Sequence, residues 1–325
     1  MKKLLIANRG EIAIRISRTA RTMGIATVGI YTADDASSLH LQHMDEAHLL
    51  PLGGVAGYLD IPAIVAVAVQ SGCDAVHPGY GLLSERAAFS QACLDHGIAF
   101  VGPSPKTLAM LGDKAEARTL AKQAGVAIIQ GSAPLEDADA AHAAFDALRG
   151  QPMMLKAVNG GGGRGMRVVH DAGDIDAAFD QCRSEALTAF GDGTLYAERF
   201  LTSVRHIEVQ IVGDGVSVTH LWERDCSIQR RNQKVIEVAP APALPSDVRD
   251  ALLTAAIRIG RATGYRGLGT VEFLVDSAAH DGAGVYFIET NPRIQVEHTI
   301  TEEITGLDLV ELQIRIAAGE PLAAL

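Results

Sequence analysis

Short apolar runs alternate with amphipathic stretches along residues 3–102. Runs such as Leu4–Ile6 and Ala75–His77 have the length and composition of buried strands, and the stretches between them repeat apolar residues at helical spacing. The pattern predicts strands at 4–6, 27–31, 47–50, 75–77 and 98–101, and helices at 11–23, 61–70 and 86–96. Strands that alternate with helices in this way form an open parallel sheet, so a parallel α/β unit is expected first.

Further along the chain the pattern changes twice. A break at Gly102–Pro105 precedes a helical stretch at 106–124, which we interpret as a connector. A smaller unit follows, with strands expected at 126–129, 153–158, 166–169 and 195–200 and helices at 139–148 and 175–187. After residue 201 the pattern is that of antiparallel hairpins, at 206–212, 216–222, 270–275 and 285–288 around a helix at 246–263. The predicted units are 1–103, 104–125, 126–200 and 201–325, which makes the fold class α/β followed by α+β.

A run of glycines, Asn159–Gly165, connects two of the predicted strands. It satisfies the Gly-x-Gly-x-x-Gly spacing, but a dinucleotide site requires a helix at this point, and residues 166–169 have the pattern of a strand. The sequence also contains no Walker phosphate loop. Two interpretations remain, a flexible hairpin or a flap whose backbone N–H groups cover a polyphosphate. Lys156 on the preceding strand favours the phosphate flap.

Two glutamates interrupt otherwise apolar strands near the end of the chain. Glu272 lies within Thr270–Val275, and Glu289 follows Val285–Ile288. If the two strands pair as a hairpin, the carboxylates stand side by side, and buried like charges repel each other. A divalent cation removes that conflict, and Mg²⁺ is commonly bound by one or two carboxylates together with nucleotide phosphates. The pair therefore predicts a nucleotide–metal site.

The polar stretch Glu289–His298 carries more chemistry than a hairpin loop requires. Arg293, Gln295 and Glu297 occupy alternate positions, which predicts that they share one side of an extended segment. A second cluster, of cations in an acidic chain, favours an anion site over a solvated sheet edge. It consists of Arg224, Arg230, Arg231 and Lys234.

Composition limits the classes of partner. The 325 residues are 48% hydrophobic, enough for more than one core, and the formal net charge is −11. That charge argues against general binding to nucleic acid or to an anionic membrane, so a bound anion needs a local cluster of cations. The longest apolar stretch, Ile61–Val69, contains Pro62 and is too short to span a membrane. The four cysteines lack the spacing of a zinc site or a disulfide framework, and we expect a cytoplasmic protein.

Taken together, these features resemble the ATP-grasp enzymes, and among them the biotin carboxylases. Each motif alone is weak, but their order and spacing extend over almost the whole chain. The matching motifs are Ile6–Ala13, His77–Gly81, Gly160–Met166, Glu223–Ser227, Gln229–Arg231 and Glu289–His298. The resemblance implies an N-terminal parallel sheet followed by an ATP-grasp fold, whose glycine flap belongs to a small lid.

The resemblance also implies a role for each candidate residue. ATP would be bound by Lys114, Lys156, Gly161, Gly162, Gly163, Gly165, Met166, Glu198, Leu201, His206, Gln229, Leu274 and Ile288. Mg²⁺ or Mn²⁺ would be held by Glu272, Glu289 and Asn291. Bicarbonate would be held by Lys234, Arg293, Gln295, Val296 and Glu297, with Glu297 as general base and Lys234 and Arg293 as catalytic cations.

The implied reaction is ATP-dependent carboxylation of biotin. Bicarbonate would attack ATP to give carboxyphosphate, and the CO₂ released from it would be captured by biotin. The implied partners are bicarbonate, a biotinylated carrier domain or protein and a carboxyltransferase component, and a homodimer is compatible with the full-length protein.

The chain departs from the family pattern in two places. Asn232 stands where the family commonly has His, so an amide replaces an imidazole near the nucleotide. The sequence ends at Leu325, before a further subdomain with an arginine that acts on biotin, so we expect a fragment that binds ATP but is impaired in turnover. Two alternatives stay open, a nucleotide-binding module without turnover and another bicarbonate-activating enzyme such as carbamoyl-phosphate synthase.

Overall fold

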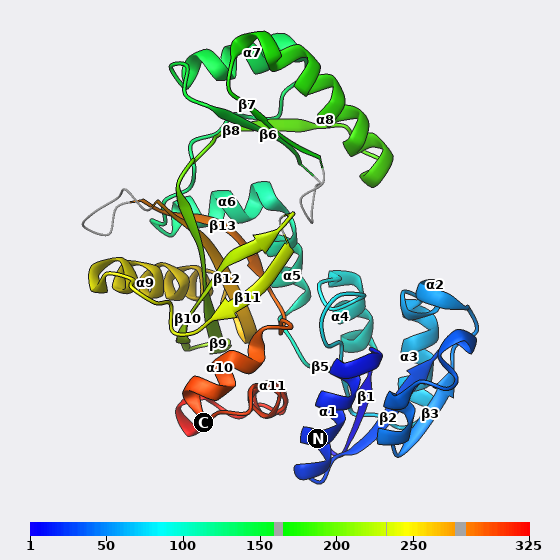
Figure 1. The fold of residues 1–325 in the computed structure, drawn as a ribbon. Coiled ribbons are helices and arrows are strands. Elements are labelled where there is room, and N and C mark those ends of the chain that lie inside the picture. The colour runs from blue at the N-terminus through cyan, green and yellow to red at the C-terminus, as the bar shows by residue number, and fades with distance from the viewer. Residues whose placement is uncertain (159–164, 232, 277–283) are drawn as a thin grey trace.

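Three β-sheets organise the computed structural model, which describes residues 1–158, 165–231, 233–276 and 284–325 (Figure 1). A parallel sheet forms the N-terminal unit, an antiparallel sheet lies at the centre, and a small antiparallel sheet lies at the far end. Each sheet has its own hydrophobic core. Several predictions fall outside the described residues, namely those for Gly161, Gly162, Gly163, Asn232 and the hairpin turn at 277–283.

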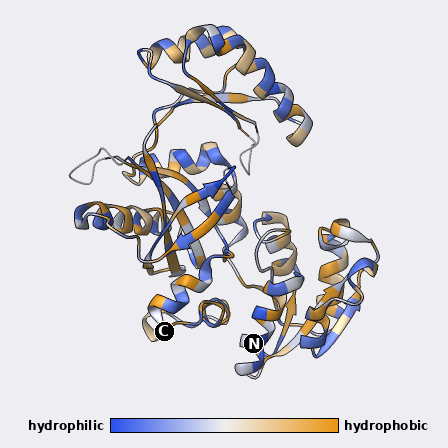
Figure 2. Ribbon diagram, in the orientation of Figure 1, coloured by the Kyte–Doolittle hydropathy of each residue, from blue (hydrophilic) through white to orange (hydrophobic). Residues whose placement is uncertain are grey.

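The N-terminal sheet is parallel throughout, with strand order β3-β2-β1-β4-β5, as the alternating pattern predicted. Its strands are β1 (Lys3–Ile6), β2 (Ala26–Tyr31), β3 (Glu46–Leu49), β4 (Ala75–His77) and β5 (Ala99–Phe100). Its helices are α1 (Gly10–Thr22), α2 (Gly54–Tyr58), α3 (Ile61–Gln70) and α4 (Ala87–Asp95), with 3-10 turns η1 (Ala33–Asp35) and η2 (Leu39–His43). Apolar side chains such as Leu5 and Val28 are completely buried, and β1 and β2 carry the hydrophobic colour in Figure 2.

The loops that follow β1 and β4 meet at one edge of this sheet. The Asn8 side chain donates hydrogen bonds to the carbonyl oxygens of Pro78 and Tyr80, at 2.8 and 2.9 Å. The first of these loops is thus a tight turn that fixes the second, which agrees with the absence of a phosphate loop after β1. The second loop, His77–Glu85, reaches the rest of the molecule through Glu85, which accepts a hydrogen bond from Arg293.

The connector is two helices rather than the single predicted one. Helix α5 (Pro105–Gly112) ends at Asp113, whose backbone is extended, and α6 (Lys114–Gln123) begins directly after it. The Asp113 carboxylate accepts hydrogen bonds from the N–H groups of Ala115 and Glu116, so it caps the second helix. As a result Lys114 stands at the N-terminus of α6.

The small sheet has strand order β7-β6-β8 and is antiparallel. Its elements are α7 (Ala138–Ala147), β6 (Met153–Ala157), β7 (Met166–Val169), η3 (Ala172–Asp174), α8 (Ile175–Phe190) and β8 (Leu195–Arg199). The strand predicted at 126–129 is wrong. Ala127 instead accepts a hydrogen bond from Phe287 N at 2.9 Å, because this segment runs beside the central sheet and does not pair within the small one.

The central sheet is antiparallel, with strand order β11-β10-β9-β12-β13. Its elements are β9 (Val204–Asp214), β10 (Val218–Arg230), β11 (Gln233–Val238), α9 (Ser246–Ala262), β12 (Arg266–Asp276) and β13 (Val285–Asn291). Successive residues of a strand point to opposite faces. Odd-numbered residues of β9 and β12, such as Val209 and Val271, join the core with α9. The even-numbered residues, Glu208 and Glu272 among them, therefore form the opposite, polar face.

The C-terminal helices join the central sheet to the N-terminal unit. Helix α10 (His298–Thr305) and helix α11 (Leu309–Ala317) pack near α1, and a short turn, η4 (Leu322–Ala324), follows. Arg15 donates hydrogen bonds to Glu302 at 2.7 Å and to Asp308 at 2.9 Å across this contact. Among the described helices we find none that combines the length and the apolar character of a membrane span.

Candidate active site

A row of charged residues crosses the polar face of the central sheet. Arg224 on β10 pairs in register with Glu208 on β9, which pairs with Glu272 on β12. Glu272 in turn pairs with Glu289 on β13, so the predicted juxtaposition of these two carboxylates is confirmed. Like charges directly opposite each other destabilise a sheet, so this row requires compensating cations.

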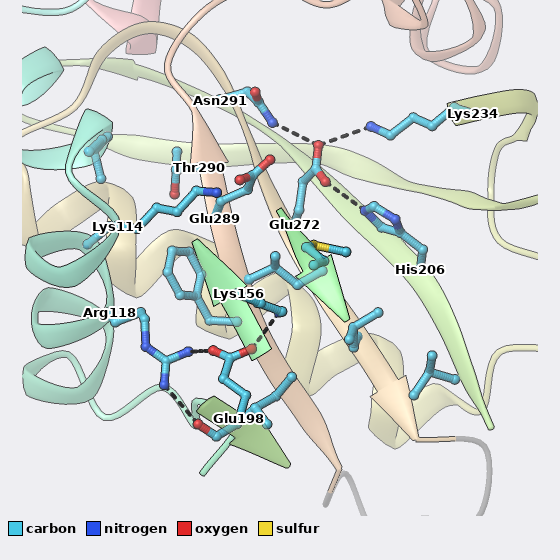
Figure 3. Close-up of a pocket in the computed structure, with 18 of the residues that line it drawn as sticks. Lys114, Arg118, Lys156, Glu198, His206, Lys234, Glu272, Glu289, Thr290 and Asn291 are labelled. Carbon is cyan, nitrogen blue, oxygen red and sulfur yellow. Dashed lines mark hydrogen bonds and ion pairs between the residues drawn. The ribbon is translucent and has the colours of Figure 1, made fainter. Parts of the chain in front are cut away.

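Glu272 is surrounded by donors (Figure 3). One carboxylate oxygen accepts hydrogen bonds from Asn291 at 2.7 Å and Lys234 at 3.0 Å, and the other accepts one from His206 at 2.7 Å. Burial alone would raise the pKa of Glu272, but the hydrogen bonds and charges of His206 and Lys234 outweigh it and lower that pKa. Glu272 is therefore a carboxylate.

The pKa of Glu289 is shifted in the opposite direction. Burial and the charge of Glu272 raise the pKa of Glu289, and the nearby cation of Lys114 offsets only part of that rise. A carboxylate in this position gains from an added positive charge. Mg²⁺ or Mn²⁺ fits, because these ions take oxygen ligands and Glu272 and Glu289 offer carboxylate oxygens side by side, with Asn291 next to them. Asn291 donates to Glu272 through its side-chain nitrogen, and its side-chain oxygen accepts from Arg293 and keeps a second lone pair.

Lys234 is a cation that lies beside the middle of this row. Its ammonium group lies 2.5 Å from Glu208, 3.0 Å from Glu272 and 2.7 Å from Glu297. Burial would lower the pKa of Lys234, but the three carboxylates raise it, so the group stays charged. Burial would likewise raise the pKa of Glu297, and the charge and hydrogen bond of Lys234 lower it instead. Glu297 is thus an ionised group that can accept a proton.

The stretch after β13 does not extend as a strand, so the predicted alternation is wrong. Ile294 and Gln295 are both buried, Val296 is 62% exposed, and the chain enters α10 at His298. The residues nevertheless converge on the site. Arg293 donates to Asn291 at 3.0 Å and to Glu85, on the loop after β4, at 2.5 Å.

A second group of charges lies under the small sheet. Glu198 on β8 accepts hydrogen bonds from Lys156 on β6 at 2.5 Å and from Arg118 on α6 (Figure 3). Arg118 also donates to the carbonyl oxygen of Ile129 at 2.9 Å and lies over the ring of Tyr196. Glu198 is only 2% exposed, so this carboxylate is held between two cations.

Members of both groups line one cavity of about 890 Å³ between the small sheet and the central sheet. All described candidates except Gly165 line it, including the apolar wall residues Met166, Leu201, Leu274 and Ile288. Gly165 lies just behind that wall with φ 67°, and a Cβ there would come within 2.9 Å of Ala157, so only glycine fits.

The predicted cluster of cations is only partly an anion site. Lys234 lines the cavity, but Arg224 is fully buried beneath it, and Arg230 and Arg231 are exposed at the edge of the sheet. The sequence interpretation also missed Arg118, which lines the cavity. A basic residue four positions after Lys114 on one helix face was the available signal.

Two family profiles match the chain. Residues 1–108 match the biotin carboxylase N-terminal domain, and residues 113–325 match the ATP-binding domain of the carbamoyl-phosphate synthase L chain. A biotin carboxylase from Halalkalibacterium halodurans is 50% identical over 325 residues, which are 99% of this chain and 71% of that protein. The mitochondrial pyruvate carboxylase of Rattus norvegicus is 50% identical over 326 residues, which are 99% of this chain but 27% of that protein.

Solved structures are similar over the same length. The biotin carboxylase–βγ-ATP complex from Campylobacter jejuni has a TM-score of 0.93 at 45% identity, and the match covers 99% of this chain and 72% of that one. The biotin carboxylase domain dimer of 2-oxoglutarate carboxylase from Hydrogenobacter thermophilus, in complex with MgADP, ADP and bicarbonate, has a TM-score of 0.92 at 42% identity, covering 99% and 70%. The chain thus spans most of the length of these biotin carboxylases and about a quarter of the pyruvate carboxylases.

Proposed function

The chain belongs to the biotin carboxylase family, and we propose that it activates bicarbonate with ATP and transfers the carboxyl group to biotin. The observation that carries the proposal is the arrangement of Lys234 and Glu297 in the same cavity as the Glu272–Glu289 pair. It combines an ionised base, a charged ammonium and a cation-binding pair of carboxylates within reach of one bound nucleotide.

The nucleotide would lie between the small sheet and the central sheet. Lys114 at the start of α6 and Lys156 on β6 would bind the phosphates, with the flap closing over them. Glu198 and Leu201 would bracket the adenine, while His206 and Gln229, which hydrogen-bond each other at 2.8 Å, would face the ribose or phosphates. In this proposal residues 126–200 are the lid of the site.

Glu272, Glu289 and Asn291 would hold Mg²⁺ or Mn²⁺, which supplies positive charge to the phosphate oxygens. The protein itself supplies position and proton acceptance. Arg293 and Lys234 would hold bicarbonate with Gln295 and the backbone of Val296. Glu297 would remove the proton of bicarbonate, because its lowered pKa keeps it ionised.

The resulting carbonate oxygen would attack the γ-phosphorus of ATP, so that the bond to ADP breaks and carboxyphosphate forms. Carboxyphosphate divides into CO₂ and phosphate, and the phosphate takes the proton of the biotin ureido nitrogen. That nitrogen then bonds to CO₂.

The proposed partners are a biotinylated carrier, a carboxyltransferase component and a second copy of the chain. Four buried free cysteines fit a reducing compartment such as the cytoplasm.

The test is ADP formation from Mg·ATP by the chain, measured with and without bicarbonate and with free biotin added. We expect ADP formation to depend on bicarbonate and to rise with biotin. Glu297→Gln should reduce this rate by about 10²-fold or more and leave ATP affinity within about threefold, because it removes the base and not the nucleotide contacts. The matched control is Glu303→Gln, which changes an exposed glutamate on helix α10, the helix that begins directly after Glu297.

Two results would contradict the proposal. Stimulation by ammonia alone would indicate a carbamoyl-phosphate synthase reaction. Tight Mg·ATP binding in calorimetry, without any ADP formed in the presence of bicarbonate, would indicate a nucleotide-binding module.

A further inference from the structure

Arg224 is a completely buried guanidinium whose five N–H groups all have side-chain acceptors. Its bonds go to Glu208 at 2.6 Å, Gln210 and Thr301 at 2.8 Å, Gln295 at 3.0 Å and Thr270 at 3.1 Å. The acceptors come from β9, β12, the loop after β13 and helix α10. A buried arginine is costly for stability, and an apolar cluster of similar volume is often as stable or more so. A full set of five bonds therefore calls for a reason beyond packing.

Two of the five acceptors, Gln295 and Glu208, connect Arg224 to groups proposed to bind bicarbonate. The oxygen of the Gln295 side chain accepts from Arg224, so its amide nitrogen is turned toward the cavity, where it donates to Glu272 at 3.2 Å. One oxygen of Glu208 accepts from Arg224, and the other accepts from the ammonium group of Lys234 at 2.5 Å. Arg224 thus fixes a donor and a cation that face the substrate.

The other three acceptors anchor the guanidinium. Gln210 on β9 and Thr270 on β12 lie opposite each other where these two strands pair. Gln210 also donates to the carbonyl oxygen of Gly269 at 2.9 Å. Thr301 is the fourth residue of α10, three positions after His298 and four after Glu297. Through these anchors Arg224 connects α10 and the loop before it, which carries Gln295 and Glu297, to the central sheet, which carries Glu208 and Glu272.

We propose that Arg224 is a positioning residue for the bicarbonate half of the reaction. The inference rests on the proposed function. Arg224 does not line the cavity and touches no substrate; it acts through the amide of Gln295 and, by way of Glu208, through Lys234. Its loss should weaken bicarbonate binding selectively, because none of its five acceptors is proposed to contact ATP, whereas Gln295 is proposed to contact bicarbonate.

The test uses Arg224→Lys and Thr301→Val in the bicarbonate-dependent ATP cleavage assay. Lysine keeps the charge but cannot reach five acceptors, so we expect KM for bicarbonate to rise about tenfold or more while KM for ATP changes less than about threefold. Thr301→Val removes one anchor at a distance from the cavity and should raise KM for bicarbonate by about two- to fivefold. If Arg224→Lys does not fold, the KM for bicarbonate of Thr301→Val tests the proposal instead.

Arg249→Lys is the matched control. Arg249 bonds at 2.9 Å to Glu223, a completely buried glutamate that neighbours Arg224 on β10 and points to the other side of the sheet. This change should lower the thermal stability and leave both KM values unchanged. Combining Arg224→Lys with Gln295→Ala should give less than the product of the two single effects on KM for bicarbonate, because part of the action passes through Gln295.

Equal changes in both KM values, or full multiplication in the double variant, would overturn the inference and identify Arg224 as a purely structural residue. The proposed function fails differently, since the unmodified chain would then form no ADP in response to bicarbonate.

Discussion

The cations of the site are bonded to carboxylates of the same site. Lys234 contacts three glutamates, Lys156 contacts Glu198, and Arg293 contacts Glu85. A chain with a net charge of −11 can therefore present anion-binding groups without an exposed basic patch. Binding of phosphate or bicarbonate would exchange one anionic partner for another, so charge is redistributed within the site.

Arg118 takes part in one such group of ion pairs. It shares Glu198 with Lys156, so Arg118→Ala leaves the buried carboxylate to Lys156 alone. Lys156 would then be held back from a phosphate, and we expect ATP to bind about tenfold more weakly. Isothermal titration with Mg·ATP measures this.

The control for that measurement is Arg167→Ala, which breaks a surface ion pair with Glu185 in the same small unit. It should leave ATP binding unchanged. Affinity that is identical in the unmodified chain and Arg118→Ala would mean that Glu198 does not restrain Lys156.

At the scale of single residues, sequence reasoning found the groups that stand out within a strand and missed those defined by distant partners. Glu272 and Glu289 were predictable because each interrupts an apolar run and the two runs form one hairpin. The pairs Arg118–Glu198 and Arg293–Glu85 join positions 80 and 208 residues apart, and no local pattern in the sequence shows which glutamate each arginine contacts. Arg224 was noticed as a cation but assigned to an anion, because burial is not visible in composition.

At the scale of elements, periodicity located most strands and helices, and the errors have local causes. The helix expected over 106–124 is divided at Asp113, whose extended backbone ends α5 and whose side chain caps α6. Gly112–Asp113 was the available signal, because aspartate is a preferred N-cap. The strand expected at 126–129 fails because its apolar residues pack beside β13.

The Asp113 side chain that caps α6 should contribute both to stability and to ATP binding. Asp113→Ala removes the acceptor for two N–H groups at the start of α6, and we expect it to cost about 0.5–2 kcal/mol of stability. Because Lys114 is the first residue of that helix, ATP affinity should fall as well. Asp113→Asn keeps an acceptor and should recover most of both losses in chemical unfolding and in nucleotide titration. An Asp113→Ala variant as stable as the unmodified chain would show that the cap does not hold the helix start.

At the scale of the whole molecule, the site is assembled from all three sheets and from the loops between them. The central sheet supplies the carboxylates, the small sheet supplies Lys156 and Glu198, and the N-terminal unit supplies Glu85. The contact of α1 with α10 and α11 keeps the N-terminal unit against the others, and Arg15 is its charged link. Stability and site geometry are therefore coupled through that contact.

Acid should weaken this contact once the pH falls below the usual pKa of aspartate. Burial would raise the pKa of Asp308, but hydrogen bonds from Arg15, Thr19 and the Glu311 N–H lower it below its usual value of 3.8. A group with a lowered folded-state pKa stabilises the fold above its unfolded pKa and loses that contribution as the pH falls. Thermal unfolding measured from pH 7 to about pH 2 should show, near and below pH 3.8, a steeper loss for the unmodified chain than for Asp308→Asn. Parallel curves would exclude Asp308 as a source of the acid sensitivity.

The most direct test of the central claim follows one oxygen atom. If bicarbonate attacks the γ-phosphorus of ATP, the oxygen that forms the new bond stays on phosphorus when carboxyphosphate releases CO₂. With bicarbonate labelled fully in ¹⁸O, the account predicts inorganic phosphate that carries one ¹⁸O atom for each ADP formed, detected by mass spectrometry. Phosphate formed at the same rate but without oxygen from bicarbonate would contradict it, because ATP would then be cleaved by water.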